Sequence, residues 1–290
     1  MSLPLFLEQT LNGVQLGVML FLMSAGLTLV FGIMNLINLA HGALYMLGAF
    51  IAATVADKSG SFLLGAVVAV VATAAIGALL EVALLRRFYH RSHLDQVLVT
   101  FGLILVFNQV TQLIWGAVPM RFNLPDAVAG SIELFPGMNY PVFRLVILGV
   151  GLVVGLLLYV MIMRTRIGMW VRAGASNRAM ASAIGVNVEM VFIGVFAAGA
   201  ALAGLAGLMA GPILAVQVGM GEPVLILALV VTVIGGIGSI NGALVAAIMI
   251  GLIDTFGRVL LSPALGSMVI FLAMAVILAW KPKGLFPVHG

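Results

Sequence analysis

Residues 168–185 read G-M-W-V-R-A-G-A-S-N-R-A-M-A-S-A-I-G, a charged, alanine-rich segment between two long apolar runs. Arg172 and Arg178 in this segment would each cost several kcal/mol if they were placed in hydrocarbon. The segment is therefore expected to be a cytoplasmic loop, and it is long enough to hold a short helix. A membrane protein that presents a small structured loop to the cytoplasm is expected to offer it to a partner protein.

The composition defines the class of protein. The 290-residue chain is 63% hydrophobic and 8% charged, and its mean hydropathy is +1.28. Soluble domains are about half apolar and about a quarter charged, so these values indicate an integral membrane protein. The 35 glycines suit transmembrane helices that pack closely. Cysteine is absent, which excludes disulfides and thiol chemistry.

Apolar runs of bilayer length predict transmembrane helices. Six runs are well defined, at residues 11–33, 36–56, 62–85, 94–115, 142–163 and 188–210. Three shorter runs follow in the C-terminal third, at 224–240, 243–261 and 265–280. The sequence therefore predicts an all-α integral membrane protein, a bundle of eight or nine transmembrane helices with broken or re-entrant segments. We expect residues 1–290 to form a single transmembrane domain with a cytoplasmic loop at 164–187.

The basic residues predict the orientation. Nine of the 13 lysines and arginines lie on one predicted side of the membrane: Arg86, Arg87, Arg91, Arg164, Arg166, Arg172, Arg178, Lys281 and Lys283. Most acidic residues lie on the other side: Glu8, Asp57, Asp126, Glu133 and Glu222. Since Lys and Arg accumulate in cytoplasmic loops, the first side is cytoplasmic, and the basic pI does not indicate a nucleic-acid partner. Nine crossings would place the N-terminus outside and the C-terminus inside, whereas a re-entrant segment would change this count.

Several site types are missing from the sequence. There is no G-x-x-x-x-G-K-[ST] motif, and none of Lys58, Lys281 and Lys283 follows a glycine-rich turn. The chain therefore does not bind ATP through a P-loop. His90 and His93 could suggest a metal site, but Arg91 and Asp95 beside them favour a solvated loop face.

Polar residues interrupt the apolar sequence between the first two spans. Asn35, Asn38 and His41 recur every three residues, so in a helix they would share one face. An unpaired buried amide costs about 1–3 kcal/mol, so these side chains need partners. The pattern is compatible with the lining or gate of a transport path and equally with a hydrogen-bonded clamp between helices.

A glycine-rich segment, G-G-I-G-S-I-N-G-A at 235–243, interrupts the C-terminal third. Gly-Gly costs about 2 kcal/mol of helix propensity, which favours a break in the helix over simple close packing. Transporters use such breaks near their substrate path. The candidate path residues in this segment are Gly235, Gly236, Gly238, Ser239 and Asn241.

Two acidic residues lie within predicted spans. Asp254 is four residues before Arg258, and Glu81 lies just before Arg86 and Arg87. Ion pairing is favoured over a proton-relay role for both acids, because each has an arginine within reach.

The loop segment has the pattern of a short capped helix. Ser176 and Asn177 can cap its N-terminus, and Gly185 is placed to end it. Four residues would form a small apolar face that another surface can approach closely: Ala179, Met180, Ala183 and Ile184. The alternative is an amphipathic connector that lies on the membrane.

The chain resembles the permease subunits of branched-chain amino-acid ABC importers, the LivH type. The resemblance rests on N-L-I-N-L-A-H-G-A-L-Y-M-L-G-A at 35–49, V-T-F-G-L at 99–103 and R-T-R-I-G-M-W-V-R-A at 164–173. It continues with A-S-N-R-A-M-A-S-A-I-G-V at 175–186, A-G-A-A-L-A-G-L-A-G at 198–207, the segment at 235–243 and K-P-K-G-L-F at 281–286. These segments cover most of the chain in the order of the family.

The resemblance implies a ribose/vitamin B12-type permease fold and no enzymatic activity in this chain. ATP and Mg would be used by two partner ATPases, and no cofactor is expected here. The other implied partners are a homologous second permease of the LivM type, a periplasmic or extracellular substrate-binding protein and membrane lipid. The loop would form the coupling helix that docks on an ATPase, with Ala179, Ala181 and Gly185 near the E-A-A-x-x-x-G-like pattern. The first acidic residue of that pattern is missing, so the register is open.

The sequence is also compared with three alternative functions: import of other small solutes, secondary transport and intramembrane proteolysis. Relatives of these permeases carry urea, short amides or other small organic solutes with the same architecture. A stand-alone secondary transporter would need neither the docking helix nor partners. An intramembrane serine protease is disfavoured, because Ile237 and Ile240 flank Gly238-Ser239 where its G-x-S-G motif requires glycine. The resemblance further implies the cytoplasmic membrane of a bacterium or archaeon as the location.

The charge pattern makes a direct prediction of topology. A cysteine introduced at Ser176 should react with a membrane-impermeant thiol reagent only from the cytoplasmic side, and one at Asn123 only from outside. The absence of native cysteine removes background labelling. The reversed labelling pattern would overturn the orientation.

Overall fold

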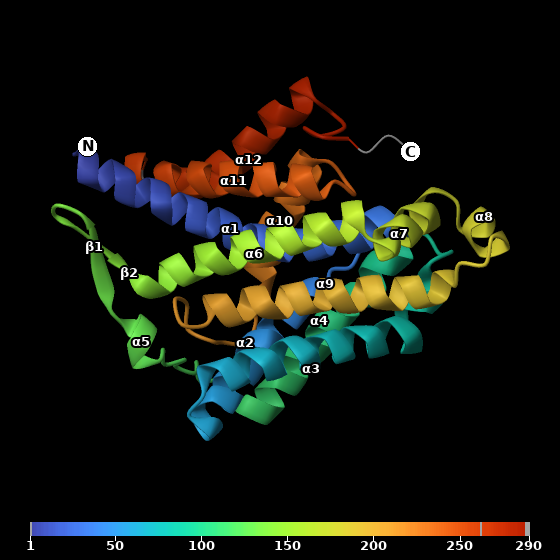
Figure 1. Cartoon of the computed structure of the whole chain (residues 1–290), viewed down its shortest axis with the longest axis horizontal. Helices are drawn as coiled ribbons and strands as arrows, with labels where there is room; N and C mark the ends of the chain where they lie inside the picture. The colour runs from blue at the N-terminus through green and yellow to red at the C-terminus, as the bar shows by residue number, and fades with distance from the viewer. Residues whose placement is uncertain (1, 262, 288–290) are drawn as a thin grey trace.

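The structure, a computed structural model, describes residues 2–261 and 263–287. Within these ranges the chain is almost entirely helical, and its one sheet is a small antiparallel hairpin (Figure 1). The elements in chain order are α1 (Leu3–Met34), α2 (His41–Ser59), α3 (Phe62–Ala83), η1 (Leu85–Phe88), α4 (His93–Trp115), α5 (Asp126–Ala129), β1 (Ser131–Phe135), β2 (Met138–Pro141), α6 (Val142–Arg164), α7 (Arg166–Ser176), α8 (Arg178–Ala183), α9 (Val188–Ala210), α10 (Gly221–Gly235), α11 (Ile240–Leu260) and α12 (Pro263–Trp280). The predicted all-α membrane class is confirmed.

In the part of the chain that the structure describes, six helices are long and apolar enough to cross a membrane: α1, α3, α4, α6, α9 and α11. Together with the shorter helices α2, α10 and α12, they make nine helices of the described chain that run along the bundle. The β-hairpin and α5 lie at one end of the long axis, and α7 and α8 lie at the other (Figure 1). We call the end with α7 and α8 the inner side, because the positive-inside rule predicts it to be cytoplasmic.

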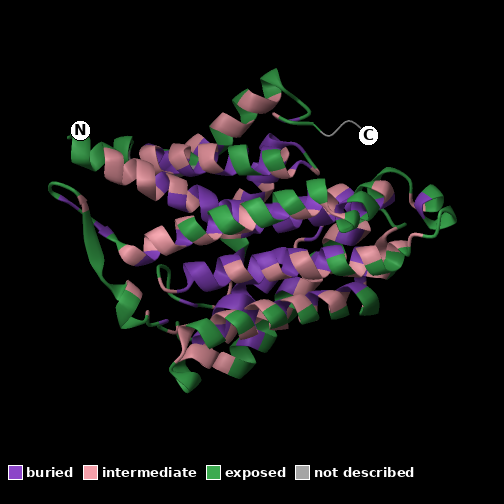
Figure 2. Cartoon of the chain, in the orientation of Figure 1, coloured by how far each residue is buried: buried purple, intermediate pink, exposed green. Residues whose placement is uncertain are grey.

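α1 and α9 form the centre of the bundle. Figure 2 shows buried residues along both helices, whereas α3 and α6 carry exposed residues on their outer faces. Glycines allow this close packing, because the space that a Cβ at Gly48 of α2 would need is occupied by the backbone of Gly204 in α9. Gly26 of α1 likewise lies against the backbone of Gly199 in α9.

Two parts of the chain have the same architecture in opposite directions. In the first, α1 crosses toward the inner side, an irregular segment (35–40) turns back into the bundle, and α2 and α3 follow. In the second, α9 crosses toward the outer side, residues 211–220 turn back, and α10 and α11 follow. The packing is reciprocal, because α1 lies along α11 and α9 lies along α3. This inverted arrangement is typical of transport proteins.

The two returning helices begin deep inside the membrane. The His41 ring at the start of α2 binds the carbonyl of Met23 on α1, at 3.2 Å. Met23 lies about three turns before Met34, which is about 16 Å along the helix axis. Because the hydrocarbon core is about 30 Å thick, α2 begins near its midplane. Gly42 packs directly against Gly221, so α10 begins at the same depth.

The irregular segment 35–40 corrects one prediction. Asn35, Asn38 and His41 do not share a helical face, because α1 ends at Met34 and Asn35 adopts a left-handed conformation with φ of 52°. The Asn35 backbone amide still donates to the Phe31 carbonyl at 2.9 Å, and its left-handed conformation then ends the helix and turns the chain back into the bundle. The predicted second span, 36–56, accordingly begins later, at His41.

The glycine-rich segment does interrupt the helix, as expected. It forms the turn between α10 and α11 at the inner side, with positive φ at Gly236 and Gly238. Ser239 caps α11 by accepting a hydrogen bond from the Gly242 amide, at 3.1 Å. The predicted span 224–240 is therefore shorter at its C-terminal end and begins earlier, at Gly221.

The Gly48–Gly204 contact gives a stability prediction. Gly48→Val should push α2 away from α9 and destabilise the protein by about 1–3 kcal/mol, seen as a lower unfolding temperature in detergent. The matched control is Gly149→Val on α6, where nothing lies within 4 Å of an added Cβ. Equal unfolding temperatures for the two variants would contradict the packing.

Candidate coupling surface and membrane path

The inner loop consists of two helices instead of one. α7 is held by its buried residues Gly168, Val171 and Gly174, and it ends at Ser176. Ser176 is therefore not a cap of the next helix, which corrects the prediction. Asn177 alone caps α8, because its Oδ1 accepts a hydrogen bond from the Met180 amide at 2.9 Å. The sequence cannot separate adjacent Ser and Asn, since both are good capping residues.

α8 is a short, well-terminated helix. Gly185 has a φ of 88°, which favours glycine, and its amide donates to the Ser182 carbonyl at 3.0 Å. The next amide, of Val186, reaches back to the Ala181 carbonyl at 3.0 Å. These two bonds satisfy the last carbonyls of the helix, as in a Schellman motif.

The exposed side of α8 is apolar. Ala181 faces the rest of the protein and is buried, whereas Met180 is 61% exposed and Ile184 is 71% exposed. The other two members of the predicted face, Ala179 and Ala183, are also exposed, as is the terminating Gly185. The arrangement presents small and adaptable groups to a surface outside the chain. The role of this surface in coupling stays a prediction.

Arg178 fixes α8 to the membrane helices. Its guanidinium donates a hydrogen bond to the carbonyl of Met34, the last residue of α1, at 2.7 Å. The same group lies over the ring of Phe192 at 4.8 Å and of Tyr89 at 5.7 Å. Arg178 thus joins α8 to α1, to α9 and to the turn after η1.

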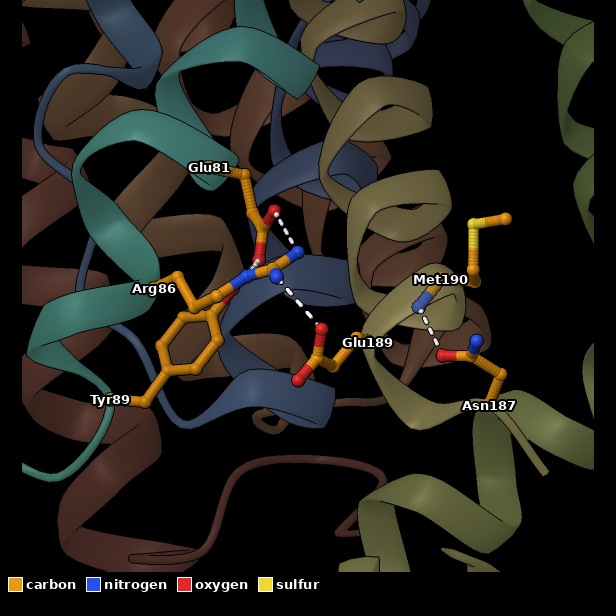
Figure 3. A network of polar contacts seen from close by, with 6 residues as sticks. All are labelled: Glu81, Arg86, Tyr89, Asn187, Glu189 and Met190. Atoms are coloured by element: carbon orange, nitrogen blue, oxygen red, sulfur yellow. Dashed lines mark hydrogen bonds and ion pairs between the residues drawn. The ribbon is translucent and has the colours of Figure 1, made fainter. Parts of the chain in front are cut away.

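A polar network stabilises the base of this surface (Figure 3). Glu81, fully buried near the end of α3, accepts bonds from Arg86 at 3.2 Å and 3.3 Å and from the Tyr89 hydroxyl at 2.6 Å. Arg86 also binds Glu189 of α9 at 2.8 Å. Burial raises the pKa of the Tyr89 phenol far above its usual range, and the bond to Glu81 raises it further, so Tyr89 remains a donor.

Both predicted ion pairs are confirmed. Glu81 pairs with Arg86, and Asp254 pairs with Arg258 at 2.8 Å. These arginines give each carboxylate a partner, which supports a structural role for both acids. Within the described residues, no group of three or more His, Cys, Asp or Glu side chains could hold a metal ion.

A large apolar cavity borders the loop. It has a volume of about 650 Å³ and lies between α6, α7 and α9, with Leu29 of α1 in its lining. The loop contributes Trp170 and Ile184 to the lining, and α9 contributes Met190 and Val195. Its lining thus includes both exposed residues of the loop, such as Ile184, and buried residues of the bundle, such as Leu29.

The predicted path residues lie at two different depths. Asn38 and His41 are buried near the midplane, whereas Asn35 is exposed at the inner end of α1. Gly235, Gly236, Gly238 and Ser239 also lie at the inner side, and Asn241 is exposed in the first turn of α11. Gly235 and Gly236 of this turn both contact the C-terminal segment. The Phe286 amide donates to the Gly235 carbonyl at 3.0 Å, and the Phe286 backbone occupies the space that a Cβ on Gly236 would need. The structure does not bring the central pair and the glycine turn together.

Buried polar atoms gather around the start of α2. His41 uses Nε2 to donate to the Met23 carbonyl, which leaves Nδ1 as an acceptor. Within the described part of the chain, this Nδ1, both polar atoms of Asn38 and the Tyr45 hydroxyl have no hydrogen-bond partner. Tyr45 was missed at the sequence level, although it follows His41 by four residues and so lies on the same helical face. An internal water could satisfy such atoms.

The position predicted for one acidic residue is wrong. Glu222, expected in an outer loop, is the second residue of α10 and lies near the membrane midplane beside Gly221. The Asn108 amide of α4 donates to its Oε1 at 2.6 Å. The sequence held a signal for this, because Gly221 and Pro223 are typical of a helix start. The predicted span began at residue 224 only because hydropathy excludes a carboxylate.

The architecture can be compared with known proteins. The model of a family described as "Branched-chain amino acid transport system / permease component" matches residues 9–278. The chain belongs to this family. It is therefore a multi-pass membrane permease of the binding-protein-dependent ABC type, in agreement with the nine helical passes of the described residues.

Relatives of this permease match it over most of its length. It is 30% identical to the high-affinity branched-chain amino acid transport system permease protein LivH of Salmonella typhimurium, over 97% of this chain and 95% of the relative. It is 28% identical to BraD of Pseudomonas aeruginosa over the same shares, and 26% identical to a probable LivH of Methanocaldococcus jannaschii over 86% and 80%. A comparison with solved structures gives no significant match.

The Arg178 anchor predicts the rigidity of α8. Arg178→Ala removes a charge-assisted hydrogen bond, worth about 1.5–3 kcal/mol, and the two aromatic contacts. Amide hydrogen exchange in α8 should then become at least tenfold faster. Arg91→Ala, in the exposed turn before α4, is the control and should leave this exchange unchanged. Unaltered exchange in the Arg178 variant would show that α8 is held by other contacts.

Proposed function

We propose that this permease forms half of the membrane path of an ABC importer for branched-chain amino acids, in the cytoplasmic membrane of a bacterium or archaeon. Its partners would be a homologous second permease, two ATPases that use ATP and Mg, and a substrate-binding protein. The printed functions of the relatives support the substrate class. The sequence has no P-loop, which supports ATP hydrolysis by separate subunits.

The observation that carries this proposal is the apolar surface of α8. Met180 of α8 and Ile184 at its C-terminal end are exposed. Figure 1 shows α8 at the inner end of the long axis, beyond α7. Arg178 and Asn177 give this surface a fixed position. An exposed apolar patch on a rigid support is typical of a protein–protein contact. A connector lying on the bilayer would need no such support, so we favour docking on an ATPase.

The proposal also assigns roles to the whole domain, to the inner loop and to the segments that return into the bundle. We infer a single permease domain, 1–290, with its coupling loop at 164–187. The path would run beside the segments that return into the bundle, with Asn38 and His41 near the midplane and the glycine turn at 235–241 at its inner end. A path of amides, small residues and apolar groups suits a solute without net charge.

Met180→Asp tests the docking surface. A charge placed in a desolvated contact should weaken association with the ATPase and reduce uptake by more than tenfold. The measurement is copurification of the ATPase together with leucine uptake by cells or proteoliposomes. Ser182→Asp is the matched control, because Ser182 is exposed on the same helix but lies off the apolar face. Unchanged copurification and uptake in the Met180 variant would rule out docking through α8.

A further inference from the structure

Glu222 is a carboxylate in an unusual place. α10 begins near the membrane midplane, because Gly221 packs against Gly42 at the depth of the His41–Met23 bond. Glu222 follows directly, and its side chain is exposed on the surface of this chain. An ionised side chain at this depth is costly against lipid, so such groups face a water-filled cavity or another protein.

The carboxylate belongs to a polar surface between two helices. Asn108 of α4 donates its amide hydrogen bond to Glu222 at 2.6 Å. Gln109 and Gln112, within the next turn of α4, are both exposed. One carboxylate and three amides therefore share a face at a depth where lipid offers no hydrogen bonds. We call this group, Asn108, Gln109, Gln112 and Glu222, the α4–α10 polar face.

An apolar crevice adjoins the carboxylate. Met46 of α2, Ile104 of α4 and Leu225 of α10 line it together with Glu222 and Asn108. The crevice is too narrow to hold a water molecule and these three side chains are buried, so they form a dry apolar support behind the carboxylate. Its position in the first turn of α10 also stabilises the negative charge, because the N-terminal end of a helix carries a partial positive charge.

We propose that the α4–α10 polar face is a wall of the hydrated solute path, and that Glu222 binds the ammonium group of the transported aliphatic amino acid. This rests on the proposed function, since it assigns a contact for that substrate class. One carboxylate with one amide gives an attraction that is weak enough to release the solute, as a transport path requires.

Hydration of the face is tested first, by thiol labelling of the complete transporter in membranes. Gln112→Cys should react with a charged methanethiosulfonate reagent at least tenfold faster than Val106→Cys. Both positions are exposed on α4, but they point about 120° apart around the helix. The absence of native cysteine in this chain makes its labelling specific. Equal rates at the two positions would overturn the proposal.

Recognition is tested in proteoliposomes that contain the full importer, its binding protein and ATP. Glu222→Gln should lower the number of leucine molecules carried per ATP hydrolysed at least tenfold, and Glu222→Asp should retain more transport than Glu222→Gln. Glu133→Gln, at an exposed acid in the outer hairpin, is the control and should transport like the parent protein. The ratio per ATP separates solute recognition from a loss of folded complex.

The possible outcomes are distinct. If the unmodified importer carries no branched-chain amino acid, the proposed function fails, while the labelling rates still decide whether the face is hydrated. If the Glu222→Gln importer carries as much leucine per ATP as the parent, the carboxylate does not recognise the solute. If Glu222→Gln instead prevents the two permeases from assembling, Glu222 pairs with a cation of the second permease, and the proposal is wrong.

Discussion

The fold depends on the contact between Gly42 and Gly221, where two helices begin in the middle of the membrane. Hydrocarbon provides no water for free backbone groups, so those parts of the irregular segments 35–40 and 211–220 that reach membrane depth must be covered by protein. Enclosure requires that neighbouring helices come very close. Residues with no side chain at the contacts, such as Gly48 and Gly204, allow that approach. The glycine content and the broken helices are thus two aspects of one constraint.

Breaking a helix inside the membrane also determines where polar side chains gather. Gln96 of α4 is buried, and its side chain accepts a hydrogen bond from the Ile37 amide at 3.2 Å. The Gly219 amide reaches the sulfur of Met46 at 3.3 Å in the second returning segment. The two breaks differ in exposure, because polar atoms near the first are enclosed, whereas Glu222 near the second faces outward. This asymmetry distinguishes a structural centre from a surface that contacts solute or partner.

The sequence predicted those features that depend on local chemistry. Hydropathy located the apolar runs, and spacing identified the pairs Glu81–Arg86 and Asp254–Arg258. The errors occurred where a long-range contact decides the local conformation. Asn35 leaves the helix in a left-handed conformation, so the three-residue spacing that follows it has no helical meaning. Hydropathy predicts Glu222 in an outer loop, because a hydropathy profile contains no information on Asn108, which is distant in sequence but lies beside Glu222 in the fold. The exposed face of α8 could be predicted, but its attachment through Arg178 could not.

That attachment gives the inner loop a physical connection to the membrane centre. Arg178 binds the carbonyl of Met34, and the next residue, Asn35, begins the segment that descends to His41. α8 is therefore joined to the chain at the point where the first broken helix turns back. Interiors packed as closely as Gly42 against Gly221 cannot deform gradually, so they move as rigid units between discrete arrangements. If a partner displaces α8, the displacement is applied directly to the element whose far end packs beside Glu222. The distance between the coupling surface and the proposed solute contact is thus bridged by a single short stretch of chain, residues 34–42.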